Sequence, residues 1–151
     1  MTYTEALPDL NGSEQPVSFQ EAVVTVISVL KEEGVDAFER EEGDGHFWTF
    51  KYGTVDVFVH LTGETSEDSI TVWAPVLDLP SKDDSALSKE LLDKNWQETS
   101  EARFAFWDSK VVVNYVRSLA DTTPSDISRA ITVVATLADD YDEPLIAKYG
   151  A

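Results

Sequence analysis

Apolar side chains recur at helical spacing in a stretch near the start of the chain. Ser18 and Glu21 precede it in the S-x-x-E order of a capping box. The apolar residues that follow are spaced as on one face of a helix: Phe19, Ala22, Val23, Val26, Ile27 and Leu30. Glu33-Gly34 should end this helix, because glycine is common just past a helix C-terminus. The pattern therefore predicts an amphipathic helix over 18–33.

A second helical pattern lies near the end of the chain. Thr123 can cap it, and Pro124 occupies the first helical position, where its missing N–H costs nothing. Its apolar face comprises Ile127, Ala130, Ile131, Val134, Ala135, Ala138 and Tyr141. We expect a helix over about 124–142 that Pro144 ends or kinks, with a further turn over 145–149.

Between these helices, apolar and polar residues alternate with the period of two that is typical of strands. The predicted strands are 35–40, 46–52, 55–62, 69–76, 102–107 and 110–118. The first is weak and runs into an acidic loop at 41–45, and a turn at 108–109 joins the last two. A short helix over about 84–95, with leucine at 87, 91 and 92, separates the fourth strand from the fifth.

The second and third of these strands form a hairpin whose register the sequence predicts. Their apolar residues share a face if Tyr52 lies opposite Val55. The turn is then 53–54 and begins with glycine, as a type II′ turn requires. The same register places Lys51 opposite Asp56, a favourable cross-strand pair.

The predicted order of elements is α-β-β-β-α-β-β-α, with an extra strand on the N-terminal side counted among the first three. Hairpin-linked strands pair in an antiparallel manner, and the interspersed helices indicate an α+β fold with an antiparallel β-sheet. Residues 1–16 contain two prolines and one glycine and show no periodicity, which predicts a flexible N-terminal arm. Residues 17–151 then form a single domain.

The predicted register leaves an aromatic set on the second face of the sheet. If Trp48 and Phe50 pack on helices, then Phe47, Phe58 and Trp73 point the other way. Large apolar patches on soluble proteins usually mark interfaces, where aromatic residues are favoured. We therefore predict Phe47, Phe58 and Trp73 as interaction residues. The alternative is that the terminal helix or the N-terminal arm covers them.

The chain is strongly acidic, since 29 Asp and Glu against 11 Lys and Arg give a net charge of −18. Such a charge repels phosphate backbones and anionic lipids, so we expect neither nucleic-acid nor membrane binding. It is compatible with plain solubility, with a basic partner and with attraction of divalent cations. The first 20 residues carry no basic side chain, so we expect no secretory signal peptide and a cytoplasmic location.

The chain carries no recognised catalytic or metal-binding motif. It has no cysteine, and it lacks a Ser-His-Asp order, a phosphate loop and a zinc helix. His46 and His60 fall on opposite faces of the predicted hairpin, so a shared metal site is not expected. The acidic runs at 39–44 and 139–143 lack the spacing of a calcium loop, although their oxygen ligands suit Ca²⁺. We expect no enzyme and no cofactor, and we keep an acidic calcium-binding protein as the alternative function.

Several stretches resemble one family of proteins. These are His46–Val55 (HFWTFKYGTV), Thr71–Val76 (TVWAPV), Glu101–Phe104 (EARF) and Ile131–Thr136 (ITVVAT). Over about 18–150 the chain resembles the YbjN-like family, in particular its cyanobacterial and plastid-type members. Members of that family resemble class I type III secretion chaperones in fold and are described as regulators of sensory transduction. The resemblance implies a non-catalytic, homodimeric, chaperone-like scaffold that binds an unidentified protein client.

Overall fold

The computed structural model describes residues 17–32 and 37–151. The helices are α2 (Phe19–Leu30), α3 (Asp84–Gln97) and α4 (Pro124–Tyr149); the strands are β1 (Phe38–Glu42), β2 (Gly45–Tyr52), β3 (Val55–Leu61), β4 (Ser69–Asp78), β5 (Arg103–Trp107) and β6 (Lys110–Ser118). All strand pairs are antiparallel, in one sheet of order β1-β2-β3-β4-β6-β5. The predicted α+β fold is confirmed, with four strands before α3 and therefore the order α-β-β-β-β-α-β-β-α. The predicted extension of the first helix to residue 33 is wrong, because α2 ends at Leu30 and the backbone of Lys31 is extended. The predicted arm 1–16 lies outside the described residues.

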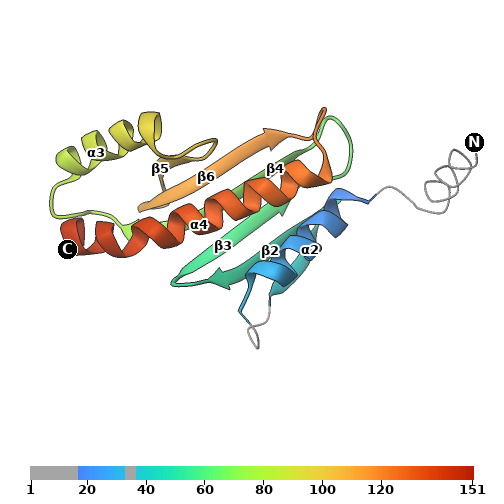
Figure 1. Cartoon of the computed structure of the whole chain (residues 1–151), viewed down its shortest axis with the longest axis horizontal. Coiled ribbons are helices and arrows are strands. Elements are labelled where there is room, and N and C mark those ends of the chain that lie inside the picture. Colours follow the sequence, from blue (N-terminus) through green and yellow to red (C-terminus); the bar gives the residue numbers. More distant parts are fainter. Residues whose placement is uncertain (1–16, 33–36) are drawn as a thin grey trace, which may run out of the picture.

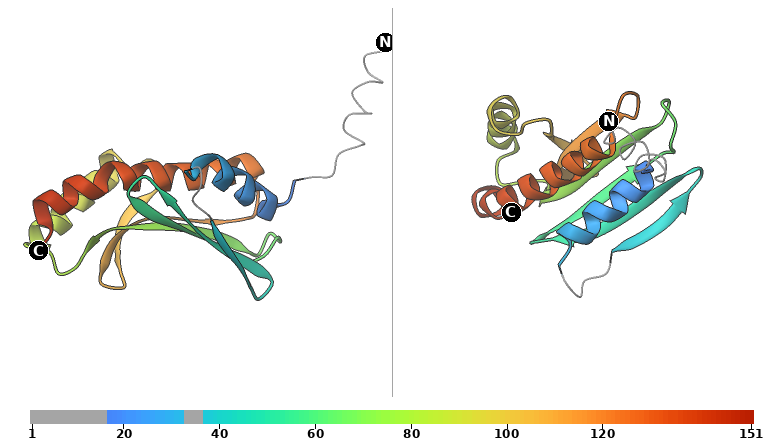
Figure 2. Two further views of the ribbon diagram at one scale, coloured as in Figure 1. Left: turned by 90° about the horizontal axis from the view of Figure 1, so that it is seen from below. Right: turned by 45° about the vertical axis from the view of Figure 1, so that its right-hand side comes forward.

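The two faces of the sheet have different surroundings. Helices α2 and α4 lie side by side on one face, which we call the helix-covered face (Figure 1). The short helix α3 lies beside β5 at one edge (Figure 2). None of the three described helices packs on the opposite face, which we call the open face (Figure 2).

Alternate strand residues build the core on the helix-covered face, as the period of two predicts. Trp48 is 2% exposed and is among the largest fully buried side chains. The other buried strand residues of this face include Phe50, Val55, Val57, Val59, Leu61, Ile70, Val72, Ala74, Val111 and Val113. They pack against buried residues of the predicted helix faces, which include Val23, Ile27, Ile127, Ile131, Val134 and Ala138. Burial of these two matched sets of side chains supplies most of the hydrophobic stabilisation.

The register of the β2–β3 hairpin is the predicted one. Tyr52 pairs with Val55, and Lys51 pairs with Asp56 at an Nζ–Oδ1 distance of 3.6 Å. Gly53 has a φ of +57°, which a side chain adopts only with strain. A Cβ atom at this position would also lie 2.2 Å from Oδ1 of Asp139 on α4. The turn therefore needs glycine for two reasons, of which the sequence pattern indicates only the first.

Element boundaries differ from the predictions most clearly in β1 and at the end of α4. Strand β1 is Phe38–Glu42, so Glu41 and Glu42 lie in the strand and not in the predicted loop. The turn to β2 is tighter than expected because Gly43, with a φ of +62°, makes it with Asp44 alone. Helix α4 does not end at Pro144 but continues to Tyr149, where buried Leu145 and Tyr149 pack on the core. Tertiary packing here outweighs the hydrogen bond that the proline removes.

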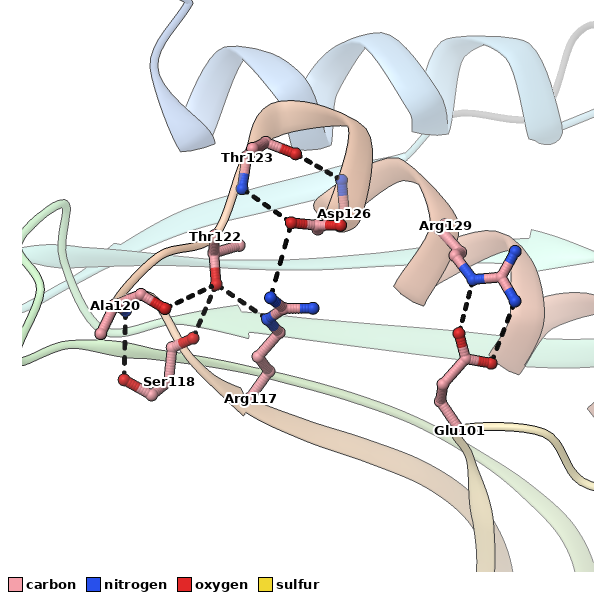
Figure 3. A network of polar contacts seen from close by, with 8 residues as sticks. All are labelled: Glu101, Arg117, Ser118, Ala120, Thr122, Thr123, Asp126 and Arg129. Atoms are coloured by element: carbon pink, nitrogen blue, oxygen red, sulfur yellow. Dashed lines mark hydrogen bonds and ion pairs between the residues drawn. The ribbon is translucent and has the colours of Figure 1, made fainter.

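Polar contacts fix where α4 begins (Figure 3). Thr123 and Asp126 form a capping box in which each side chain accepts a hydrogen bond from the other residue's backbone N–H. Arg117 of β6 reaches the same carboxylate at 3.5 Å and donates from Nε to the Thr122 hydroxyl at 2.8 Å. One turn later, Arg129 makes a two-pronged contact with Glu101 at 2.5 and 3.2 Å. Hydrogen bonding from Arg129 lowers the pKa of the Glu101 carboxyl from 4.5 to about 2.

The outer edge of β5 is closed by one side chain of α3. Asn95 accepts the backbone N–H of Phe104 at its Oδ1 atom, 2.7 Å away. Its Nδ2 atom donates to the Phe104 carbonyl at 3.2 Å. The amide thus occupies both backbone groups that this residue presents to the edge.

Candidate interaction surface

The three predicted interaction residues lie together on the open face. Phe58 and Trp73 are directly paired across β3 and β4, and their rings stack with centroids 5.4 Å apart. Phe47 of β2 lies 6.0 Å from each of these two rings. All three side chains are half-buried, mainly against one another and the strands beneath. Strand alternation is what brings them to one face, since their neighbours Trp48, Val57 and Val72 point to the core.

A fourth aromatic residue, Trp107 of β5, extends this set. Its ring meets Trp73 edge-on at 6.0 Å, and the residue is 57% exposed. We call Phe47, Phe58, Trp73 and Trp107 the aromatic strip. Trp107 was not among the predicted residues, yet a signal for it existed. The predicted turn at 108–109 implies that Phe104 pairs with Val113, as it does in the structure, and this register sends odd-numbered residues of β5 to the open face.

Polar groups border the strip on both sides. Arg40 of β1 lies over the Phe47 ring, with Cζ 4.3 Å from the centroid, in a cation–π contact. At the other end, a pocket of about 410 Å³ lies beside Trp73 and Trp107 and is also lined by His60, Thr71 and Asn114. The strip therefore offers ring surfaces for apolar side chains and, next to them, donors and acceptors that could fix a bound backbone.

Most acidic side chains of the strands on the open face are paired with basic ones, in contrast with the acidic character of the whole chain. Three ion pairs follow the strands: Arg40–Glu42 at 3.3 Å, Lys51–Asp56 at 3.6 Å and Lys110–Asp78 at 2.9 Å. The hydrogen bond to Asp78 raises the pKa of the Lys110 ammonium. Such pairing leaves the strip without the surplus of negative charge that would repel another acidic surface.

Two segments were the alternatives that could cover these aromatic residues: the terminal helix and the N-terminal arm. The terminal helix α4 lies on the helix-covered face and does not cover the strip. The N-terminal arm, the second alternative, lies outside the described residues.

Within the described chain, no helix is long and apolar enough to cross a membrane.

The histidines and acidic runs do not form a metal site in the structure. His46 stacks on Trp48 on the helix-covered face, with centroids 5.5 Å apart, whereas His60 pairs with Phe47 and faces the open side. The prediction that they lie on opposite faces is thus confirmed. Across residues 17–32 and 37–151, no group of three or more His, Cys, Asp or Glu side chains is placed to hold a metal ion.

Comparison with solved structures agrees with the predicted fold. The chain is similar to ExsC, as seen in the crystal structure of the ExsC–ExsE complex, with a TM-score of 0.50. The identity is 13%, and the match covers 85% of this chain and 96% of the other, so the likeness concerns the fold. No curated protein matches the chain.

The family comparison covers most of the chain. Residues 22–147 match the model of the YbjN family, whose description is "Putative bacterial sensory transduction regulator". The matched segment runs from α2 to the last turn of α4 and includes the whole aromatic strip. The chain therefore belongs to the YbjN family.

Proposed function

We propose that this chain is a non-catalytic, protein-binding regulator that acts in the bacterial cytoplasm as a chaperone-like homodimer. The observation that carries the proposal is the aromatic strip, which lies on a sheet face that the described helices leave uncovered. Phe47, Phe58 and Trp73 are the residues that bind the client. Aromatic rings bury a large area at a small cost in conformational entropy, so they suit the centre of a protein interface.

A second apolar surface supports the homodimer. On α3, Trp96 is 88% exposed and Leu92, one helical turn earlier, is 68% exposed. Leu92 also lines a groove of about 320 Å³ together with Phe106 of β5. Large exposed apolar residues that are contiguous across two elements are typical of a subunit contact. This surface at the β5 edge leaves the aromatic strip free for the client.

The structural neighbour supports a protein partner. ExsC is seen there in a complex with ExsE, so a chain of this fold binds another protein in that case. The family description supports a regulatory role. The calcium-binding alternative has no support of this kind, because the described residues contain no suitable group of ligands.

The two surfaces can be tested separately. Trp96→Ser should convert a dimer of twice 16.8 kDa into a monomer in sedimentation equilibrium, without loss of the folded state. Phe58→Ser and Trp73→Ser should leave the dimer intact and weaken binding of a client isolated from the native cell, measured by calorimetry with the purified pair. Val116→Ser is the matched control, because Val116 is exposed on the open face outside the strip.

The proposal is wrong if the unmodified chain is monomeric at micromolar concentration and the two strip variants bind the client as well as Val116→Ser does. It is also wrong if Phe58→Ser and Trp73→Ser unfold the chain cooperatively with no separable binding defect, because the residues would then belong to the core.

A further inference from the structure

Strands β3 and β4 separate at one end of the sheet. Their pairing runs from Leu61–Ile70 to Phe58–Trp73, and the part of β3 that precedes Phe58 diverges from β4 (Figure 1). Pro75 lies where the two strands part and has no N–H for a ladder. A bulge between Pro75 and Leu77 follows, and bulges bend a strand and increase its twist.

A pocket of about 530 Å³ fills this separation. On the open face it is lined by Phe58 of the aromatic strip and by the ion-paired Asp56, Asp78 and Lys110. Its walls include the apolar residues Val55, Val76 and Leu77. On the helix-covered side it reaches α4, where it is lined by Asp142 and Ile146. The pocket therefore leads from the proposed client surface, between two strands, to a helix on the far side.

The Asp142 carboxylate lacks the partners that a buried charge requires. The residue is 5% exposed, and its Oδ2 atom accepts a hydrogen bond from the Thr54 hydroxyl at 2.7 Å. That hydroxyl also lies 3.2 Å from the Asp139 carboxylate, so its one hydrogen is shared between two acidic groups. The Oδ1 atom of Asp142 has no hydrogen-bond partner among the described residues. The two lysines near the pocket, Lys51 and Lys110, are paired with Asp56 and Asp78 instead.

We infer that this pocket binds a lysine or arginine side chain of the client, with the charged group at Asp142 and the apolar stem between β3 and β4. A buried carboxylate without a partner is costly, and a cationic donor removes that cost. Lysine and arginine combine a charged head with a long apolar stem, which matches a pocket with apolar walls and an acidic inner end. The inference rests on the proposed function and names the chemistry of the partner.

The occupant is a side chain of a polypeptide and not a metal ion. Asp142, Asp56 and Asp78 do not form one ligand group, since the described part of the chain contains no metal-binding cluster. Phe58 belongs to the aromatic strip and also lines the pocket, so a client held on the strip can place a neighbouring basic residue in the pocket. Asp56 and Asp78 are already paired with lysines, so Asp142 carries the uncompensated charge of the lining, and this charge favours a cation over a neutral group.

Small probes test the pocket without a client. The isotope-labelled full chain is titrated with N-acetyl-lysine methylamide, and in parallel with the norleucine compound, which has the stem without the charge. The lysine compound should produce saturable shifts in the NMR signals of Thr54, Val76 and Ile146. The norleucine compound should bind about tenfold more weakly or not at all, because a charge-assisted hydrogen bond is stronger than a neutral contact.

Variants assign the effect to Asp142. Asp142→Asn keeps the size of the side chain and should abolish the preference for the lysine compound. Asp140→Asn is the matched control, because it removes the same charge from an exposed position of the same helix and should keep the preference. Ile146→Trp narrows the pocket while keeping the carboxylate, so it should also weaken binding of the lysine compound. This variant tests the pocket if Asp142→Asn does not fold.

The inference is overturned if the two compounds bind alike, or if the two asparagine variants behave alike. It is also overturned if n-pentylammonium binds more tightly than the blocked lysine, because the site would then be one for free amines. Trp73→Ser should leave probe binding unchanged. A negative result with the probes therefore leaves the proposed function standing, since that function depends on the strip.

Discussion

Two adjacent residues of β2 show how the two faces of this sheet differ. Trp48 points to the helix-covered face, where α2 and α4 leave it 2% exposed. Phe47 points to the open face, where it meets two other rings and the Arg40 guanidinium but no helix. Similar aromatic side chains thus stabilise the fold on one face and remain available for recognition on the other. The difference arises from strand alternation together with the placement of both long helices on one side.

Removal of a core side chain on the helix-covered face should have the largest effect on stability. Trp48→Ala leaves a cavity in the packed core, so we expect it to lower the free energy of unfolding by about 3–5 kcal/mol. Urea denaturation followed by circular dichroism measures this change. Val29→Ala is the control, because Val29 of α2 is 77% exposed and lies outside both proposed surfaces, so its removal should change stability by less than about 0.5 kcal/mol. Equal losses in the two variants would contradict the assignment of the core.

The turn between β2 and β3 gives a second, smaller test. Gly53→Val imposes both a strained φ and a clash with Asp139, whereas Gly43→Val imposes a similar φ with no atom within 4 Å of the new Cβ. Strain alone costs about 1–3 kcal/mol, so Gly43→Val should stay in that range and Gly53→Val should exceed it. Thermal unfolding of the two variants measures the difference. If both lose the same stability, the contact of the turn with α4 contributes nothing.

The open face should respond less than the core to the same substitution. Trp73→Ala removes a half-buried ring that contacts Phe58, Phe47 and Trp107. We expect a loss of about 1–2 kcal/mol, since much of the ring area lies at the surface in the folded chain. Urea denaturation alongside Trp48→Ala checks this order. A loss as large as that of Trp48→Ala would place Trp73 in the core.

Removal of the Arg129–Glu101 ion pair should have the smallest effect on stability. Because the folded-state pKa of Glu101 is lowered to about 2, its contribution to stability is present above a pH of about 4.5 and is lost as the pH falls toward 2. Arg129→Met should therefore cost little stability at neutral pH, because water screens an ion pair between exposed side chains. Its difference from the unmodified chain should shrink across that interval in pH-dependent urea denaturation. A constant difference would mean that Arg129 acts through packing and not through its charge.

The sequence predicted those features that depend on local spacing. The helical periods, the capping box at Ser18, the cap at Thr123 and the pairing of Lys51 with Asp56 are all confirmed. Phe47, Phe58 and Trp73 were placed on one face by parity alone, and their rings do meet there. Their role in association remains a prediction.

Other features depend on contacts between distant segments, which spacing does not reveal. The continuation of α4 past Pro144 depends on the burial of Leu145 and Tyr149 against the rest of the core. The pocket at Asp142 requires the separation of β3 from β4, and the separation involves a bulge in β4 that alternation does not predict. The sequence pattern therefore gives no sign that a side chain of the acidic run at 139–143 is buried, although Asp142 is.

The contact of Asn95 with Phe104 bears on how this protein avoids growing into fibres. A sheet edge normally offers its backbone as a template on which further strands can add, one chain after another. Here one amide side chain imitates a residue of the next strand and satisfies both backbone groups of Phe104. The edge of β5 is thereby closed at Phe104 from within the chain, next to the apolar residues Leu92 and Phe106. An apolar surface can thus be displayed at this edge for specific contact without an open ladder beside Phe104 that would let strands stack without limit.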